Sequence, residues 1–193
     1  MKVLPRIVLL AFAFASCLAN AQFNLAGPAA KMTVLMNPDV QKELKLSGDQ
    51  KKQLQKILKD ATSNPTAAMS GTMMPGDFMS AMDAKFLAVL DEPQTTRLTE
   101  LWVQYEGPCV LKDKVVAEKV GLKDDQPSKI AEIWGAYEQE FMEGMRSPSG
   151  SKGLKKKRKA ANEATLAILT AEQAATYEAM KGKEFKFKTK KEI

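Results

Sequence analysis

Apolar residues recur at helical spacing along most of this chain. One stripe follows Ser47 at intervals of three and four residues, which places its members on one face of a helix: Leu54, Ile57, Leu58 and Ala61. A longer stripe predicts a helix that ends near Arg146, and its members are Ile130, Ile133, Trp134, Tyr137, Phe141 and Met145. Further helices are expected over 37–45, 79–90 and 98–105, the last one stopping at Gly107-Pro108. The pattern predicts an all-α protein.

Four short segments share a Leu that is followed four positions later by Gln. The residue after the Leu can act as a helix N-cap, and the Gln then falls at the third helical position, from which it reaches back to the cap amide. In the third segment Lys123 is a poor cap, so we expect Asp124 to take over. Each Leu should pack into a shared core. The residues concerned are Leu46, Ser47 and Gln50; Leu90, Asp91 and Gln94; Leu122, Asp124 and Gln126; and Leu169, Thr170 and Gln173.

The second half of the chain repeats the first. Residues 40–57 align with 116–133 at an offset of 76, and 86–98 align with 165–177 at an offset of 79, with apolar residues facing apolar residues. Such a period indicates an internal duplication. We expect two tandem copies of a four-helix unit (short, long, long, short) over 34–106 and 110–187, forming a helical bundle or cradle. An N-terminal leader (22–33) and a basic C-terminal tail (188–193) flank them. The tail region, in which Phe185 to Lys188 alternate apolar and basic residues, is expected to be frayed.

The N-terminus has the pattern of a secretory signal peptide. Lys2 and Arg6 precede a short apolar run, and Ala19-Asn20-Ala21 is a cleavage site of small residues, so residues 1–21 should be removed and the protein should be periplasmic or secreted. The alternative is a lipid anchor at Cys17. Cleavage lowers the net charge from +6 to +4, because Lys2 and Arg6 leave and no acidic residue does. Cys109 is then the only cysteine, expected as a small buried apolar residue rather than an interchain bridge.

The composition argues against an enzyme. The chain has no histidine, which removes the usual general base at neutral pH and the common His-based nucleophile and zinc sites. No phosphate-binding glycine loop or calcium-binding loop is present either. The paired acids at 91–92 and 124–125 lie where helix N-termini favour them. We therefore expect no catalysis, no cofactor and no metal site of the usual donors.

A cluster of methionines allows three interpretations. Thioethers are flexible apolar groups that fill imperfect cores, adapt to varied partners, or bind Cu(I). A filled core is the simplest account, contact with client proteins is the second, and copper is the third. The residues are Met69, Met73, Met74, Met79 and Met82.

A run of five cations marks the second half. Consecutive cations cannot share one helix face, and positive charge at a helix N-terminus opposes the dipole, so we expect a solvated arm outside the packed region. It is either plain solvated surface or a contact for unfolded or acidic proteins or an anionic membrane surface. Export argues against nucleic acid as the partner. The run consists of Lys155, Lys156, Lys157, Arg158 and Lys159.

The four Leu-to-Gln segments, above all Leu169-Thr170-Ala171-Glu172-Gln173, resemble the signature of the LTXXQ-motif family of Spy/CpxP-like periplasmic proteins. The resemblance covers about 34–182. It implies a small all-α cradle, usually a homodimer, that acts as an ATP-independent chaperone or envelope-stress adaptor and binds clients on a basic, partly apolar concave face. Metal-sensing relatives use histidine ligands, which this chain lacks. The alternative function is a structural or copper-scavenging envelope protein that uses the methionine-rich segment.

The number of motifs bears on assembly. The resembled family usually has two motifs per chain, so that a dimer presents four, and this chain has four by itself. A fused duplication favours a monomer over a homodimer. Its halves would then bury the stripe at Leu54, Ile57 and Leu58 against the stripe at Ile130, Ile133 and Tyr137.

Overall fold

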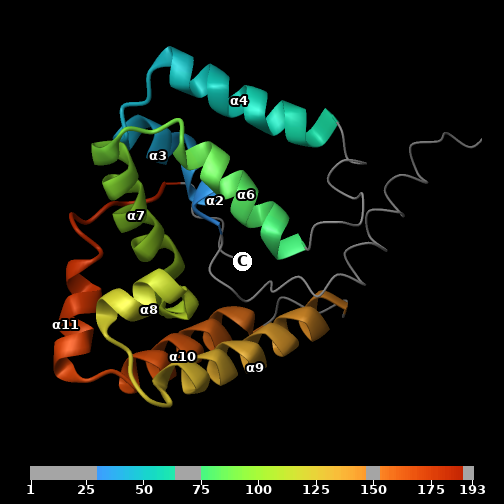
Figure 1. Cartoon of the computed structure of the whole chain (residues 1–193). Helices are drawn as coiled ribbons and strands as arrows, with labels where there is room; N and C mark the ends of the chain where they lie inside the picture. The colour runs from blue at the N-terminus through green and yellow to red at the C-terminus, as the bar shows by residue number, and fades with distance from the viewer. Residues whose placement is uncertain (1–29, 64–74, 147–152, 189–193) are drawn as a thin grey trace, which may run out of the picture.

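A computed structural model describes residues 30–63, 75–146 and 153–188 (Figure 1). The fold is all-α, as predicted, and the described residues include no strand. The predicted signal peptide, the Cys17 anchor site, residues 22–29 of the leader and residues 189–193 of the tail lie outside these ranges. No helix in the described ranges is both long and apolar enough to cross a membrane.

Short and long helices follow a similar order in the two halves of the chain. The first half contains α2 (Lys31–Leu35), α3 (Pro38–Glu43), α4 (Gly48–Ser63), α6 (Pro75–Leu87) and α7 (Glu92–Glu106). The second contains the 3-10 helix η1 (Gly107–Lys112), α8 (Lys114–Val120), α9 (Gln126–Arg146), α10 (Leu154–Ala167) and α11 (Ala171–Ala179). α9 extends through the predicted stripe as far as Arg146, the last described residue before the gap at 147–152. The expected short last helix fits α11 with 9 residues but is wrong for α7, which has 15.

Helix α2 begins at Lys31, before residue 34, where the first helical repeat was predicted to start. Residues 31–33, assigned to the leader, begin α2, whose first turn is held by Asp83 of α6: the Asp83 carboxylate accepts a 2.7 Å hydrogen bond from the Met32 backbone N–H. Val34 and Leu35 of α2 are buried, and so are Val110 and Leu111, the residues 76 positions later in η1. Both short elements contribute buried apolar side chains to the centre of the molecule.

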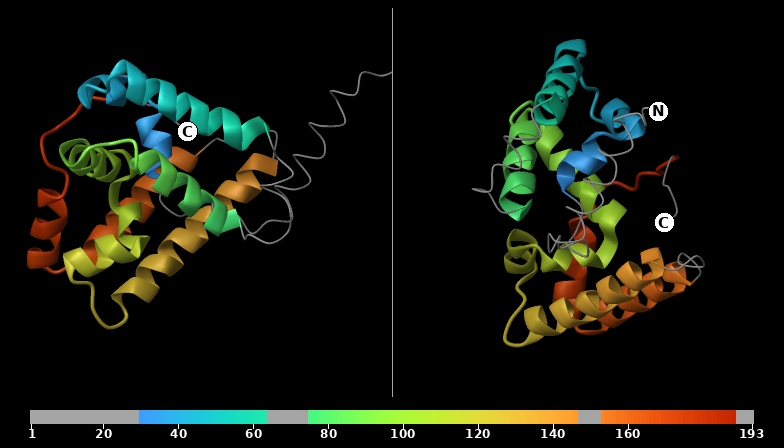
Figure 2. Two further views of the ribbon diagram at one scale, coloured as in Figure 1. Left: turned by 45° about the horizontal axis from the view of Figure 1, so that its top comes forward. Right: turned by 90° about the vertical axis from the view of Figure 1, so that its right-hand side faces the viewer.

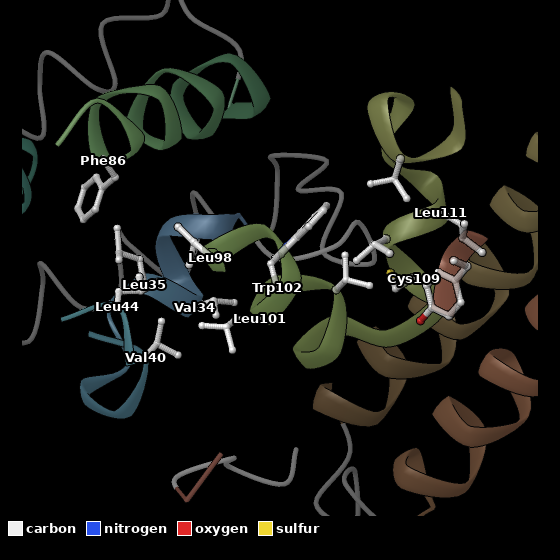
Figure 3. Close-up of a cluster of buried hydrophobic side chains, with 14 of the residues drawn as sticks. Val34, Leu35, Val40, Leu44, Phe86, Leu98, Leu101, Trp102, Cys109 and Leu111 are labelled. Carbon is white, nitrogen blue, oxygen red and sulfur yellow. The ribbon is translucent and has the colours of Figure 1, made fainter. Parts of the chain in front are cut away.

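The core is centred on α7. Leu98, Leu101 and Trp102 of α7 are buried between the side chains of α2 on one side and those of η1 on the other (Figure 3). α7 packs against α2, and η1 contacts α8, α9 and α10. The first helices of both halves thus converge on one hydrophobic cluster, which includes Cys109. We call this central region the hub.

Two helical hairpins extend from the hub. α4 and α6 form the first hairpin, and α9 and α10 form the second, on the opposite side of the molecule (Figures 1 and 2). The prediction that the stripes of α4 and α9 pack against each other is therefore wrong. Leu54 of α4 and Ile130 of α9 are instead buried in the central hydrophobic cluster, and Ile57, Ile133 and Tyr137 pack against it.

Candidate functional site

The Leu-to-Gln segments are helix starts with reciprocal caps. The Ser47 hydroxyl accepts a hydrogen bond from the Gln50 backbone N–H (3.1 Å), and the Gln50 side chain accepts one from the Ser47 N–H (3.0 Å). Asp91 with Gln94, and Thr170 with Gln173, form complete capping boxes of the same kind. The predicted capping role of these residues is confirmed. The motif leucines also lie as predicted, since all of them belong to the core or pack on its edge: Leu46, Leu90, Leu122 and Leu169.

The capping glutamines also pair with each other, which sequence reasoning missed. The Gln50 Nε2 donates to the Gln94 Oε1 (2.7 Å), and the Gln94 Nε2 donates back to the Gln50 Oε1 (3.2 Å). The remaining donor of each amide reaches a backbone carbonyl, that of Val89 for Gln50 (3.0 Å) and that of Leu44 for Gln94 (3.2 Å). We call this closed pair the first Gln clasp. It ties the start of α4 to the start of α7.

The second half contains the same arrangement. Gln126 and Gln173 exchange two hydrogen bonds, of 2.8 and 2.9 Å, and Gln126 also donates to the Ile168 carbonyl (2.9 Å). Gln173 donates to the Gly121 carbonyl (2.7 Å). This second Gln clasp ties the start of α9 to the start of α11. Buried amides that satisfy both donors and the acceptor contribute stability and fix one geometry.

One predicted cap is wrong. Asp124 has φ of 54°, a left-handed conformation, whereas an N-cap residue needs an extended backbone. α9 begins two residues later, at Gln126, and the Asp125 carboxylate lies 2.7 Å from the Lys129 Nζ. This ion pair lowers the pKa of Asp125. Gln126 still reaches back, accepting a hydrogen bond from the Lys123 N–H (2.9 Å), so the clasp survives the loss of the cap.

The apolar stripe on α4 is partly exposed. Leu54 is buried, but Ile57 and Ala61 are only partly buried, and Leu58 is 39% exposed. Lys51 lies two helical turns before Leu58 on the same side, and three further lysines complete the helix surface: Lys52, Lys56 and Lys59. A partly apolar stripe with cations beside it can contact apolar and acidic groups of one partner. We call this surface the α4 face.

The basic run is not a solvated arm, which corrects the prediction. It forms the first turns of α10, whose buried face carries Leu154 and Ala161. Arg158 lies on that same face, at i+4 from Leu154. Five consecutive cations therefore fit a packed helix because one of them, Arg158, points inward and pairs with an acidic residue. Lys157 is exposed, with its Nζ 3.3 Å from the Glu140 carboxylate of α9. The other three are exposed: Lys155, Lys156 and Lys159.

The inward cation meets the end of α7. The Arg158 Nη2 lies 3.2 Å from the Glu106 backbone carbonyl and 3.4 Å from its carboxylate, and Glu106 is buried at 7% exposure. This contact joins the second hairpin to the hub. Burial, reinforced by the Glu106 charge, raises the pKa of the neighbouring Cys109 thiol to about 12, so the thiolate is scarce at neutral pH. Cys109 is buried as predicted.

The methionine cluster is only partly described. Met82 is 5% exposed and belongs to the core, so it cannot serve as an exposed client contact. Met79 lies in α6, and Met69, Met73 and Met74 lie outside the described residues. Among the residues that the structure describes, no cluster of histidine, cysteine or carboxylate side chains could hold a metal ion.

The chain after α11 makes contacts that sequence reasoning missed. Residues 181–187, which we call the C-terminal strap, run back along α7 (Figure 1). Arg97 and Gln104 of α7 donate to carbonyls of the strap, and Tyr105 meets Phe187. The prediction of a frayed tail is wrong for Phe185 to Phe187, which contact Gln104 and Tyr105. The alternation of Phe185 and Phe187 with lysines was a sequence sign of a segment with one apolar side.

Comparisons of the chain with protein-family models, with curated proteins and with solved structures found no match.

Proposed function

We propose that this protein is an exported, ATP-independent chaperone or stress adaptor that holds unfolded or acidic proteins of the bacterial envelope. One observation carries the proposal: α4 leaves Ile57 partly buried and Leu58 39% exposed beside lysines, although the protein has a well-filled core elsewhere. A stable helix that keeps an apolar stripe partly open suits transient contact with apolar segments. The resemblance of the four motifs to the LTXXQ family supports the same function.

The surface charge fits such clients. The exposed lysines of α10 add to those of α4, and a positive surface attracts unfolded chains that are rich in acid and accelerates the first encounter. The same charge would favour an anionic membrane surface as a second partner. The resulting affinity should fall with salt, because contacts between exposed charges are screened.

We further propose that the chain arose by tandem duplication and acts as a monomer. The recurring helix order and the recurring Gln clasp within each half support this idea. Each clasp is completed by two motifs of one half, so neither half needs a second chain to close its own hairpin. Light scattering should give the mass of one chain at micromolar concentration.

Aggregation of an unfolded client tests the function. The mature chain, without nucleotide, should suppress the light scattering of a chemically unfolded acidic protein on dilution. Leu58→Ser should weaken suppression several-fold, because it removes the exposed apolar contact while leaving the core intact. Val115→Ser is the matched control, since Val115 is 72% exposed on α8, a helix that lies away from α4 (Figures 1 and 2). It should change nothing.

Two results would contradict the proposal. The unchanged protein could fail to suppress aggregation at a several-fold excess over client. Alternatively, Leu58→Ser and Val115→Ser could behave alike, which would remove the α4 face as the client contact. Circular dichroism of both variants verifies that they remain folded.

A further inference from the structure

The C-terminal strap is held mainly through its backbone. The Gln104 amide of α7 donates to the carbonyls of Lys181 and Lys183, the latter at 2.8 Å, and accepts a hydrogen bond from the Phe185 N–H at 2.9 Å. Arg97 donates to the Lys183 carbonyl at 2.9 Å. The Gln104 amide thus makes three hydrogen bonds, two donated and one accepted, to one segment. Backbone groups are the same in every peptide, so this recognition does not depend on the strap's own sequence.

Side chains of the strap add a simple selectivity. Phe185 and Phe187 are partly buried while Glu184, Lys186 and Lys188 are exposed, which is the alternation of an extended segment lying on a surface. The Phe187 ring meets Tyr105 edge-on at 5.2 Å and Phe185 at 4.9 Å. Aromatic pairs of this geometry are favourable beyond the area they bury. A segment with aromatic residues at alternate positions therefore fits this place.

We infer that the outer side of α7, formed by Arg97, Gln104 and Tyr105, is a binding site for extended peptide segments with aromatic residues at alternate positions, and that the chain's own strap occupies it in cis. The identity of the ligand as an unfolded client rests on the proposed function. The site itself rests only on the contacts above. The strap then acts as an intramolecular competitor that a client must displace.

Tethering makes the strap a strong competitor. A segment joined to its site by a short connection has an effective concentration on the order of millimolar, so a free peptide binds poorly while the strap is in place. Gly182 is the turn on which docking depends, since it has φ of 57° and its N–H donates to the Ala179 carbonyl. Loss of either the aromatic contacts or this turn should release the strap.

Peptide binding to the full chain tests the inference. The probe is a fluorescently labelled peptide with the sequence of residues 181–188, followed by fluorescence anisotropy. Phe185→Ser combined with Phe187→Ser should release the strap, and this variant should bind the probe at least about tenfold more tightly than the unchanged protein. Adding Gln104→Ala should abolish the gain. A control peptide with serine at both phenylalanine positions keeps the charge and should bind at least about tenfold more weakly.

A second variant guards against misfolding. Gly182→Pro keeps both phenylalanines but fixes φ near −65° and removes the N–H, so the docked turn cannot form. If the double serine variant loses helical circular dichroism, Gly182→Pro is the deciding measurement. The inference is overturned if the folded variant binds the probe no more tightly than the unchanged protein. It is also overturned if the gain in binding persists after Gln104→Ala, or if the serine peptide binds as tightly as the probe. The aggregation assay of Leu58→Ser tests the α4 face and does not depend on the strap. A negative result in the peptide-binding experiment can therefore be distinguished from a failure of the proposed function.

Discussion

The two hairpins place their bulky side chains on opposite helices. At the position where α4 carries Leu58, 39% exposed, α9 carries Trp134, 1% exposed. On the returning helices the order is reversed. α6 buries Met82 and Phe86, and the positions 79 residues later in α10 hold the smaller Ala161 and Thr165, also buried: the Thr165 hydroxyl donates to the Ala161 carbonyl at 2.7 Å.

The two hairpins also differ in how closely their helices pack together. α9 lies along α10, and Lys157 and Glu140 bridge the two helices on the surface, whereas α4 meets α6 over a much shorter stretch. Both hairpins start from the same Gln clasp. The clasp therefore sets where a hairpin begins, and the residues two to three turns further along decide whether it closes. The first hairpin stays partly open at the α4 face.

Substitution at the matched pair should have the largest effect. Trp134→Ala should lower the free energy of unfolding by about 4 kcal/mol, because it leaves a large cavity in the second hairpin. Leu58→Ala should cost less than about 1 kcal/mol, since that side chain is already partly in water. Trp134→Phe keeps a large aromatic ring but removes the indole N–H. The Trp134 Nε1–H has no hydrogen-bond partner within the described structure, so the loss of this N–H alone should change the free energy of unfolding little. Urea denaturation of the three variants measures this, and equal losses at positions 58 and 134 would refute the contrast.

The inward cation of α10 comes next. Arg158→Ala should cost about 2 kcal/mol, because it strands the buried Glu106 carboxylate, although the Arg158 side chain is 35% exposed and partly screened. Lys156→Ala, on the solvent side of the same helix, should change the stability by less than about 0.5 kcal/mol. Thermal melts of the two variants compare them directly. Similar melting temperatures would mean that Arg158 contributes no more to stability than the exposed lysines of the basic run.

The two clasps should differ in strength. Gln173 is 8% exposed, so Gln173→Ala should cost about 1.5 kcal/mol by leaving the Gly121 carbonyl and the Gln126 amide without their partner. Gln50→Ala should cost less, because water reaches the more exposed first clasp. A double-mutant cycle of Gln126 with Gln173 gives the pairwise coupling. Additive losses would mean that the side chains act only as independent caps.

The smallest expected effect on stability concerns two backbone turns with a positive φ, at Lys45 and Gly121. Lys45 has φ of 51°, and Gly121, 76 residues later, has φ of 76° in the matching turn. Gly121→Ala should cost about 1 kcal/mol from conformation alone, since no atom lies within 4 Å of the added Cβ. Lys45→Gly should conversely stabilise the protein by about 0.5 kcal/mol. Chemical denaturation resolves both signs, and destabilisation by Lys45→Gly would contradict the matched-turn reading.

Local patterns in the sequence were enough to predict the helices and their starts. Caps and helical stripes depend on residues within a few positions of one another, so the capping boxes at Asp91 and Thr170 and the long helix α9 follow from spacing. The burial of Cys109 follows from the usual behaviour of a free cysteine, which packs as a small apolar residue. The all-α class needed nothing more.

Contacts between distant segments could not be predicted in the same way. Gln50 was expected to bond within its own helix start, and nothing nearby in the chain indicates Gln94 as its partner. The placement of Arg158 depended on Glu106, 52 residues away, which turned an expected arm into a packed helix. The C-terminal strap likewise needed Gln104 as a partner.

The strap also bears on the order in which the protein can fold. Gln104 and Arg97 meet Lys183 across separations of 79 and 86 residues. A chain synthesised from its N-terminus must therefore expose this side of α7 until residues 181–187 have emerged. Contacts of such long range form late and slow the last folding step. We expect the final rate-limiting event to be the docking of a short terminal segment rather than the assembly of the helices.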